Sequence, residues 1–208
     1  RCLSDWSSDV CSSDLAVPWT KTDDGDASLI ALYPAAGQPR ALRVAPVGAP
    51  LPESPALSEA DWLWSEVASG IATLSAPVVD AFVPQMLNYE SVEGVNFKKG
   101  CYPGQEVVAR SQFRGTLKRR AYIAHAQQPL AAGMEVFTPE DLEQATGTVV
   151  QAAPAPDGSW DAIISMQTSS ADKPLLAHAA LGEGQRADAA QAVALQLKPL
   201  PYALREDI

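Results

Sequence analysis

The chain is poor in the residues that build metal centres and disulfide frameworks. It has three cysteines and two histidines in 208 residues, and they show no paired spacing. A structural zinc site usually needs about four Cys or His ligands, and an iron–sulfur cluster about four thiolates. An odd, low cysteine count also argues against a disulfide framework and favours a reducing compartment. We therefore expect no metal site and a cytoplasmic location.

Long apolar runs and several common active-site patterns are absent too. No stretch approaches the roughly 18 apolar residues of a membrane-spanning helix. The first residues lack the basic region and apolar core of a signal peptide. The GxSxG, P-loop and GxGxxG patterns do not occur. The sequence thus gives no sign of a membrane span, of export or of these kinds of site.

Positive charge is scarce overall but concentrated in one segment. The net charge is −10, which argues against nucleic-acid or membrane-surface binding by the whole molecule. Residues 98–120 are the exception, with three lysines and four arginines against the single acid Glu106. This segregation favours an anionic ligand, although a solvated basic face is an equally good reading. The basic residues are Lys98, Lys99, Arg110, Arg114, Lys118, Arg119 and Arg120.

The basic segment opens with FKKGCYPGQE, residues 97–106, which contains Cys101. Positive charge or a helix start beside a thiol favours the reactive thiolate, and this cysteine follows two lysines and precedes an expected helix. Gly100 and Gly104 would allow a tight turn or the close approach of a ligand. A small, buried, inert cysteine is the alternative. A Cys–His pair with His125 would rest on weak evidence.

The first half of the chain shows a mixed pattern. Residues 28–34 and 41–47 read as two strands of a hairpin. A helix is expected to begin at Ser58, with Asp61 completing an approximate capping box. A second helix is expected after Gly104, with Gly115 ending it.

The pattern changes to short strands from Lys118 onward. Gly, Pro and Asp separate these runs, and their spacing favours a small antiparallel barrel or sandwich. We place a domain boundary near residue 117. The expected strands cover residues 119–126, 134–139, 147–155, 160–167 and 192–200.

The first fifteen residues differ from the rest. RCLSDWSSDVCSSDL is a Ser/Asp-rich quasi-repeat, and position 1 is not methionine. We interpret residues 1–15 as a non-native or disordered segment. We also expect that part of the native N-terminal region is missing.

The stretch FVPQMLNYESVEGVNFKKGCYPGQEVVARSQFRG, residues 82–115, resembles the signature of YgfZ-type folate-binding proteins, and LKPLPYAL at 197–204 resembles the close of the same family. This family shares the fold of the aminomethyltransferase (T protein) of the glycine cleavage system. The resemblance implies an α+β fold: a partial folate-binding α/β domain over 16–117, incomplete at its N-terminus, and a C-terminal antiparallel β-barrel over 118–208.

The resemblance also implies a function. Members bind tetrahydrofolate or a derivative and support iron–sulfur cluster assembly or repair in client enzymes, including tRNA-modifying ones. The implied partners are folate and iron–sulfur client enzymes or assembly proteins, with no membrane and no direct nucleic-acid binding. Cys101 is the implied functional thiol. Counting back from the proline of VPQ places a folate-contacting tryptophan at Trp62. With the arginines of the basic segment, the candidate cofactor-binding residues are Trp62, Lys99, Gly100, Tyr102, Gly104, Gln105, Glu106, Arg110 and Arg114.

Two other functions stay open. The shared fold allows a folate-dependent, aminomethyltransferase-like one-carbon transferase, whose key acid would lie in the N-terminal region that we expect to be missing. The basic segment allows an RNA-binding module, whose affinity should fall steeply with salt. Enzymatic activity is therefore undecided, and an accessory role is favoured.

Overall fold

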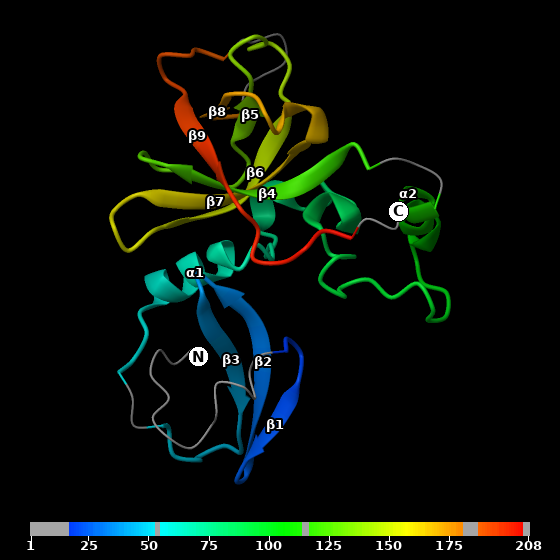
Figure 1. Ribbon diagram of the computed structural model, residues 1–208, viewed down its shortest axis with the longest axis vertical. Coiled ribbons are helices and arrows are strands. Elements are labelled where there is room, and N and C mark those ends of the chain that lie inside the picture. Colours follow the sequence, from blue (N-terminus) through cyan, green and yellow to red (C-terminus); the bar gives the residue numbers. More distant parts are fainter. Residues whose placement is uncertain (1–16, 53–54, 114–116, 181–186, 206–208) are drawn as a thin grey trace.

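The computed structural model describes residues 17–52, 55–113, 117–180 and 187–205. A small antiparallel sheet lies at one end and a closed β-barrel at the other, with α1 between them (Figure 1). The predicted α+β class with a β-barrel is confirmed. Segment 1–15, with our interpretation of it, lies outside the described residues.

The small sheet has the order β1-β2-β3 and antiparallel pairing. The predicted hairpin is confirmed, and its turn residues Ala36 and Gly37 have φ of 49° and 76°, as a two-residue hairpin turn requires. The first strand was not predicted, because KTDD lacks the apolar alternation of a strand. The strands are β1 (Lys21–Asp24), β2 (Ala27–Ala35) and β3 (Gln38–Val44).

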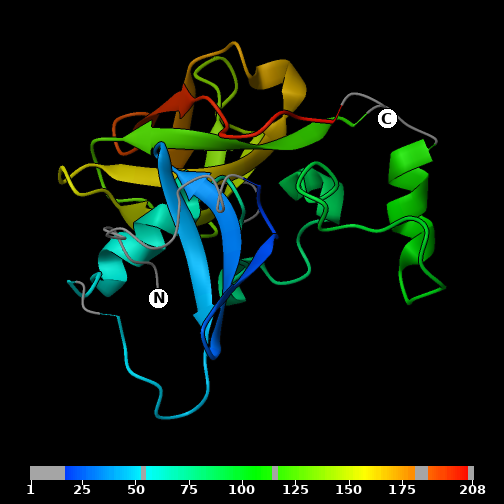
Figure 2. The same cartoon turned by 60° about the horizontal axis from the view of Figure 1, so that its bottom comes forward.

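Helix α1 (Glu59–Ala68) begins as predicted. The Ser58 hydroxyl accepts a hydrogen bond from the Asp61 backbone N–H at 3.0 Å. After the helix, Gly70 has φ of 70°, and an added Cβ would lie 3.0 Å from the Tyr202 ring. The helix contacts β2 on one side and β6 and β7 on the other (Figures 1 and 2).

The connection to the barrel contains η2 (Ala76–Val78), η3 (Pro84–Leu87) and α2 (Gln105–Phe113). The second helix has the predicted start, while the residue predicted to end it, Gly115, lies outside the described residues. Both views show α2 standing away from α1 (Figures 1 and 2). None of the helices in the described ranges has the length and apolarity to cross a bilayer.

The barrel closes in the order β4-β7-β6-β5-β8-β9. Its interior is filled by buried aliphatic residues such as Val149 and Ile164. Gly147 allows close approach of two strands, since an added Cβ would lie 2.4 Å from the Met166 Cβ. Five of the strands were predicted, and the short β8 was missed. They are β4 (Arg119–Ala126), β5 (Glu135–Phe137), β6 (Gly147–Pro154), β7 (Trp160–Gln167), β8 (Leu175–His178) and β9 (Val193–Lys198), with η4 (Thr168–Ser170) after β7. The domain boundary near residue 117 stays a prediction.

Candidate functional site

The motif residues 99–106 form a surface loop that turns into α2. Gly104 has φ of 81°, a left-handed conformation that favours glycine, whereas Gly100 has no positive φ and open space around it. Cys101 is a free, exposed thiol. The alternative that this cysteine is a buried packing residue is therefore wrong.

Several predicted site residues lie together in this loop. The Lys99 ammonium lies 4.6 Å from the centre of the Tyr102 ring, a cation–π geometry. The Tyr102 backbone N–H donates to Gln105 Oε1 at 3.4 Å. Glu106, in the first turn of α2, forms an exposed ion pair with Arg110, so that guanidinium already has a local partner. Arg114 lies outside the described residues.

A cavity of about 670 Å³ lies beside the motif, between the loop that precedes it, α2 and the C-terminal segment. Phe97 and Phe113 meet edge to face with ring centroids 5.5 Å apart, and Phe113 is 71% exposed. None of residues 99–106 lines the cavity, but their neighbour Lys98 does. The lining residues are Glu90, Glu93, Val95, Asn96, Phe97, Lys98, Gln112, Phe113 and Arg205.

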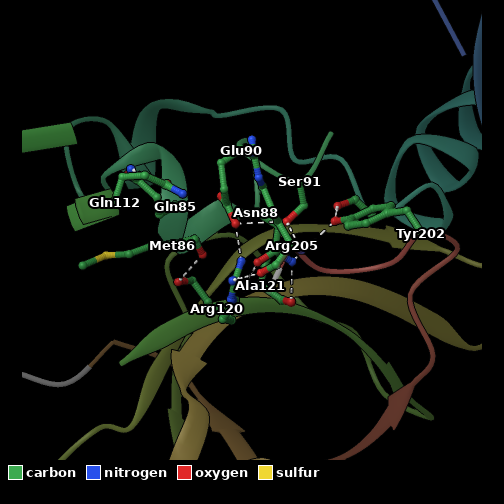
Figure 3. A network of polar contacts seen from close by, with 12 residues as sticks. Gln85, Met86, Asn88, Glu90, Ser91, Gln112, Arg120, Ala121, Tyr202 and Arg205 are labelled. Carbon is green, nitrogen blue, oxygen red and sulfur yellow. Dashed lines mark hydrogen bonds and ion pairs between the residues drawn. The ribbon is translucent and has the colours of Figure 1, made fainter. Parts of the chain in front are cut away.

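Glu90 is the buried acid of this cavity. Its Oε1 forms an ion pair with Arg120 and accepts from the Ser91 hydroxyl at 3.0 Å (Figure 3). Its Oε2 is buried and has no hydrogen-bond partner among the described residues. The second guanidinium nitrogen of Arg120 donates to the Arg205 carbonyl at 3.1 Å. Arg120 belongs to the basic segment in which we expected an anionic ligand. Because it is buried and paired with Glu90, it is not available to bind such a ligand.

Buried amides hold the loop that carries Glu90. Asn88 adopts a left-handed φ of 59°, donates to the Ala121 carbonyl at 2.9 Å and accepts from the Ala121 N–H at 3.2 Å (Figure 3). Gln85 donates to the Val108 carbonyl of α2 at 2.7 Å. The loop is thus fixed to the barrel on one side and to α2 on the other.

Comparison with known proteins agrees with the family resemblance of the motif. No protein-family profile matches the chain. Curated relatives named "tRNA-modifying protein YgfZ" do match it: the Serratia proteamaculans protein at 35% identity over 154 residues, the Sodalis glossinidius protein at 36% over 149, and the Yersinia pestis protein at 36% over 156. The matched part of this chain is YgfZ-type. Each match covers 70% of this chain but only 42% of the relative.

Trp62 lies apart from the motif. It belongs to α1, and the Arg40 guanidinium carbon lies 4.7 Å from the centre of its ring. It does not line the cavity beside the motif, and α1 and α2 are separated in both views (Figures 1 and 2). The structure does not bring Trp62 to the other predicted residues, and its folate contact stays a prediction.

Sequence reasoning missed the buried part of the candidate site. The acid Glu90 and its partner Arg120 are 30 residues apart, so no local pattern joins them. The sequence did carry one signal for a buried acid: the carboxylate of Glu90 lies among the apolar residues of MLNYESV. Among the described residues, no three His, Cys, Asp or Glu side chains gather as metal ligands.

Proposed function

We propose that this chain acts in tRNA modification as a tetrahydrofolate-binding accessory protein, supporting iron–sulfur cluster assembly or repair in client enzymes. The names of its relatives support the tRNA part of this role. The intact KGCYPGQE motif supports the folate and iron–sulfur parts, as the resemblance implies. The chain spans about two-fifths of its relatives, so the role of the whole protein belongs to the proposal.

The unpartnered oxygen of Glu90 is the observation that carries the proposal. A buried polar atom without a partner is costly, and a ligand that supplies a donor recovers the loss. A pterin ring presents an N–H and an amino group side by side, which suit a carboxylate acceptor. The cavity volume of about 670 Å³ is in the usual range for cofactor sites.

The other walls of the cavity suit the rest of a folate. Phe97 and Phe113 offer aromatic surface for a flat ligand. Lys98 lines the cavity and Lys99 follows it, both exposed; their charge suits the glutamate tail of a folate. The bound folate would supply one-carbon or redox chemistry, and the exposed Cys101 thiol would face a client from the adjoining loop.

Calorimetric titration of the chain with tetrahydrofolate, under anaerobic conditions, tests this proposal. We expect saturable binding that weakens about fivefold or more in Phe113→Ala, because aromatic stacking on a flat ring is lost. Val107→Ala is the matched control, since Val107 is an exposed apolar residue of the same helix that does not line the cavity. No binding by the unmodified chain, or equal losses in both variants, would contradict the proposal.

The accessory role needs a cellular test. Cells that lack their own YgfZ protein would express a chimera in which this chain replaces the matching part of the Serratia relative. We expect the chimera to restore the activity of an iron–sulfur-dependent tRNA-modifying enzyme, and Cys101→Ser to abolish most of that gain. Full restoration by the serine variant would show that the thiol has no part in the role.

A further inference from the structure

The C-terminal segment, residues 199–205, runs from the barrel to the cavity beside the motif. Figure 1 shows it in red, leaving β9 and running toward α2. Tyr202 anchors it midway: its hydroxyl donates to the Gly70 carbonyl at 2.7 Å, and its ring meets Tyr33 edge to face with centroids 5.8 Å apart. Beyond this anchor, Arg205 lines the cavity.

The backbone of Arg205 completes a closed ring of polar contacts with Glu90 (Figure 3). Its N–H donates to the Ser91 hydroxyl at 3.0 Å, and that hydroxyl donates to Glu90 Oε1 at 3.0 Å. Its carbonyl accepts from Arg120 Nη2 at 3.1 Å, and the other terminal nitrogen of Arg120 pairs with the same Oε1. Both groups that hold the carboxylate are thus also bonded to the C-terminal segment.

This arrangement closes Glu90 off from a ligand. Its side chain has no exposed surface, and Oε2 is buried without a hydrogen-bond partner among the described residues. A buried acceptor of this kind gains from a donor that reaches it. A ligand in the cavity can therefore meet Oε2 only after part of the wall has moved.

The end of the C-terminal segment is the part of the wall best suited to move. Residues 203–205 include no buried side chain, so their displacement uncovers little apolar surface. The other walls are held by buried amides: Asn88 bonds the loop of Glu90 to Ala121 of the barrel, and Gln85 bonds to α2. Water can replace the backbone hydrogen bonds that the displaced residues lose.

We propose that residues 203–205 form a latch that must open before a ligand can reach Glu90 Oε2. When the latch opens, the segment turns about the Tyr202 anchor, and Arg120 Nη2 becomes available to a ligand oxygen. The inference rests on the proposed function, because the ligand that the latch admits is the folate. The apparent affinity for folate is then the affinity of the open state reduced by the fraction of molecules that are open.

Two variants at one position isolate the latch bond. Arg205→Pro removes the backbone N–H that donates to Ser91, whereas Arg205→Ala removes the side chain and keeps the N–H. Equal circular dichroism spectra establish that both are folded. Each is combined with Ser91→Cys, and brief iodoacetamide treatment followed by peptide mass spectrometry gives the alkylation rate at position 91. The exposed Cys101 of the same sample is the reference thiol.

Affinity for tetrahydrofolate is measured separately, by anaerobic calorimetry on variants that keep Ser91. We expect alkylation at position 91, relative to Cys101, to be about threefold or more faster in Arg205→Pro than in Arg205→Ala, because the latch is open more often. We also expect Arg205→Pro to bind tetrahydrofolate about fivefold more tightly than Arg205→Ala, the equivalent of one neutral hydrogen bond.

Equal alkylation rates in the two variants would overturn the latch. So would tetrahydrofolate binding by Arg205→Pro that is equal to, or weaker than, binding by Arg205→Ala. A different result would separate the latch from the proposed function. Faster alkylation in the proline variant, with no tetrahydrofolate binding by either variant or by the wild type, would refute the folate site and leave the opening of the segment established.

Discussion

Arg120, on the first strand of the barrel, forms a buried ion pair with Oε1 of Glu90, in the loop that precedes the motif. The pair fixes the carboxylate in the wall of the cavity and leaves Oε2 without a partner. The Glu90 side chain is itself fully buried, so a ligand donor that meets this oxygen must displace part of the cavity wall. The barrel therefore contributes to the site without lining it, because it holds the acceptor in place.

Arg120→Met should destabilise the fold strongly. It leaves the Glu90 carboxylate buried without a compensating charge, which typically costs about 3–5 kcal/mol. Urea unfolding followed by circular dichroism measures this loss. The control Arg119→Met, at the half-buried neighbouring position, should change the free energy of unfolding by less than about 1 kcal/mol. The double variant Glu90→Gln/Arg120→Met should regain part of the loss, and no recovery would show that the two residues act independently.

Replacement of Asn88 by glycine or by alanine should lower the stability of the fold. Asn88→Gly keeps the left-handed backbone but leaves the Ala121 N–H and carbonyl unpaired, with an expected loss of about 2 kcal/mol or more. Asn88→Ala should lose somewhat more, because alanine disfavours the φ of 59°. Thermal and urea unfolding compare the two. Equal stability of wild type and the glycine variant would refute the role of the amide.

Asp161 should make the fold sensitive to acid. Burial alone would raise the pKa of Asp161, but hydrogen bonds from Lys198, Trp64 and His125 outweigh it and hold the pKa below its ordinary value of 3.8. A carboxyl with a lowered folded-state pKa contributes stability above its unfolded pKa and loses it as the pH falls through the folded value. Stability should therefore drop below about pH 4.

The test is Asp161→Asn, with Asp80→Asn at an exposed position as control. The Asp161 variant should be less stable at neutral pH and should show a shallower decline in urea-unfolding free energy below about pH 4. The Asp80 variant should follow the wild-type curve. Parallel curves for wild type and Asp161→Asn would contradict this account of the cluster.

Cys101 should be open to alkylation and should lose reactivity when folate is bound. The thiol is exposed, and it lies in the loop that continues from the cavity residues Phe97 and Lys98. Peptide mass spectrometry after brief iodoacetamide treatment measures the rate at this residue. Saturating tetrahydrofolate should slow the reaction severalfold. An unchanged rate at a folate concentration that saturates the calorimetric signal would place the ligand away from the loop.

Local patterns predicted much of the fold. Short β-like runs separated by Gly, Pro and Asp gave the bounds of β4 and β7 as the structure has them, and the cap at Ser58 gave the start of α1. The strand β1 was missed because KTDD contains no apolar residue, and the short strand β8, LLAH, was not recognised as a separate run.

The site was predicted only where it is local. The loop of Lys99, Tyr102 and Glu106 follows from the contiguous motif, whereas the partner of Glu90 lies 30 residues away. Elsewhere in the fold, the ion pair of Arg40 with Glu66 likewise joins residues that are 26 positions apart. Contacts of this kind depend on how sheet, helix and barrel pack, which no local pattern of residues records.

The affinity of the chain for tetrahydrofolate, compared between wild type and Glu90→Gln, tests the central claim most directly. The amide keeps the shape of the side chain but removes the charge that accepts from the pterin. We predict that the dissociation constant rises about 10- to 100-fold, in line with a lost hydrogen bond to a charged group, while Glu59→Gln, on the exposed start of α1, leaves it unchanged. Equal affinity of wild type and a folded Glu90→Gln variant would contradict the claim that this buried carboxylate holds the cofactor.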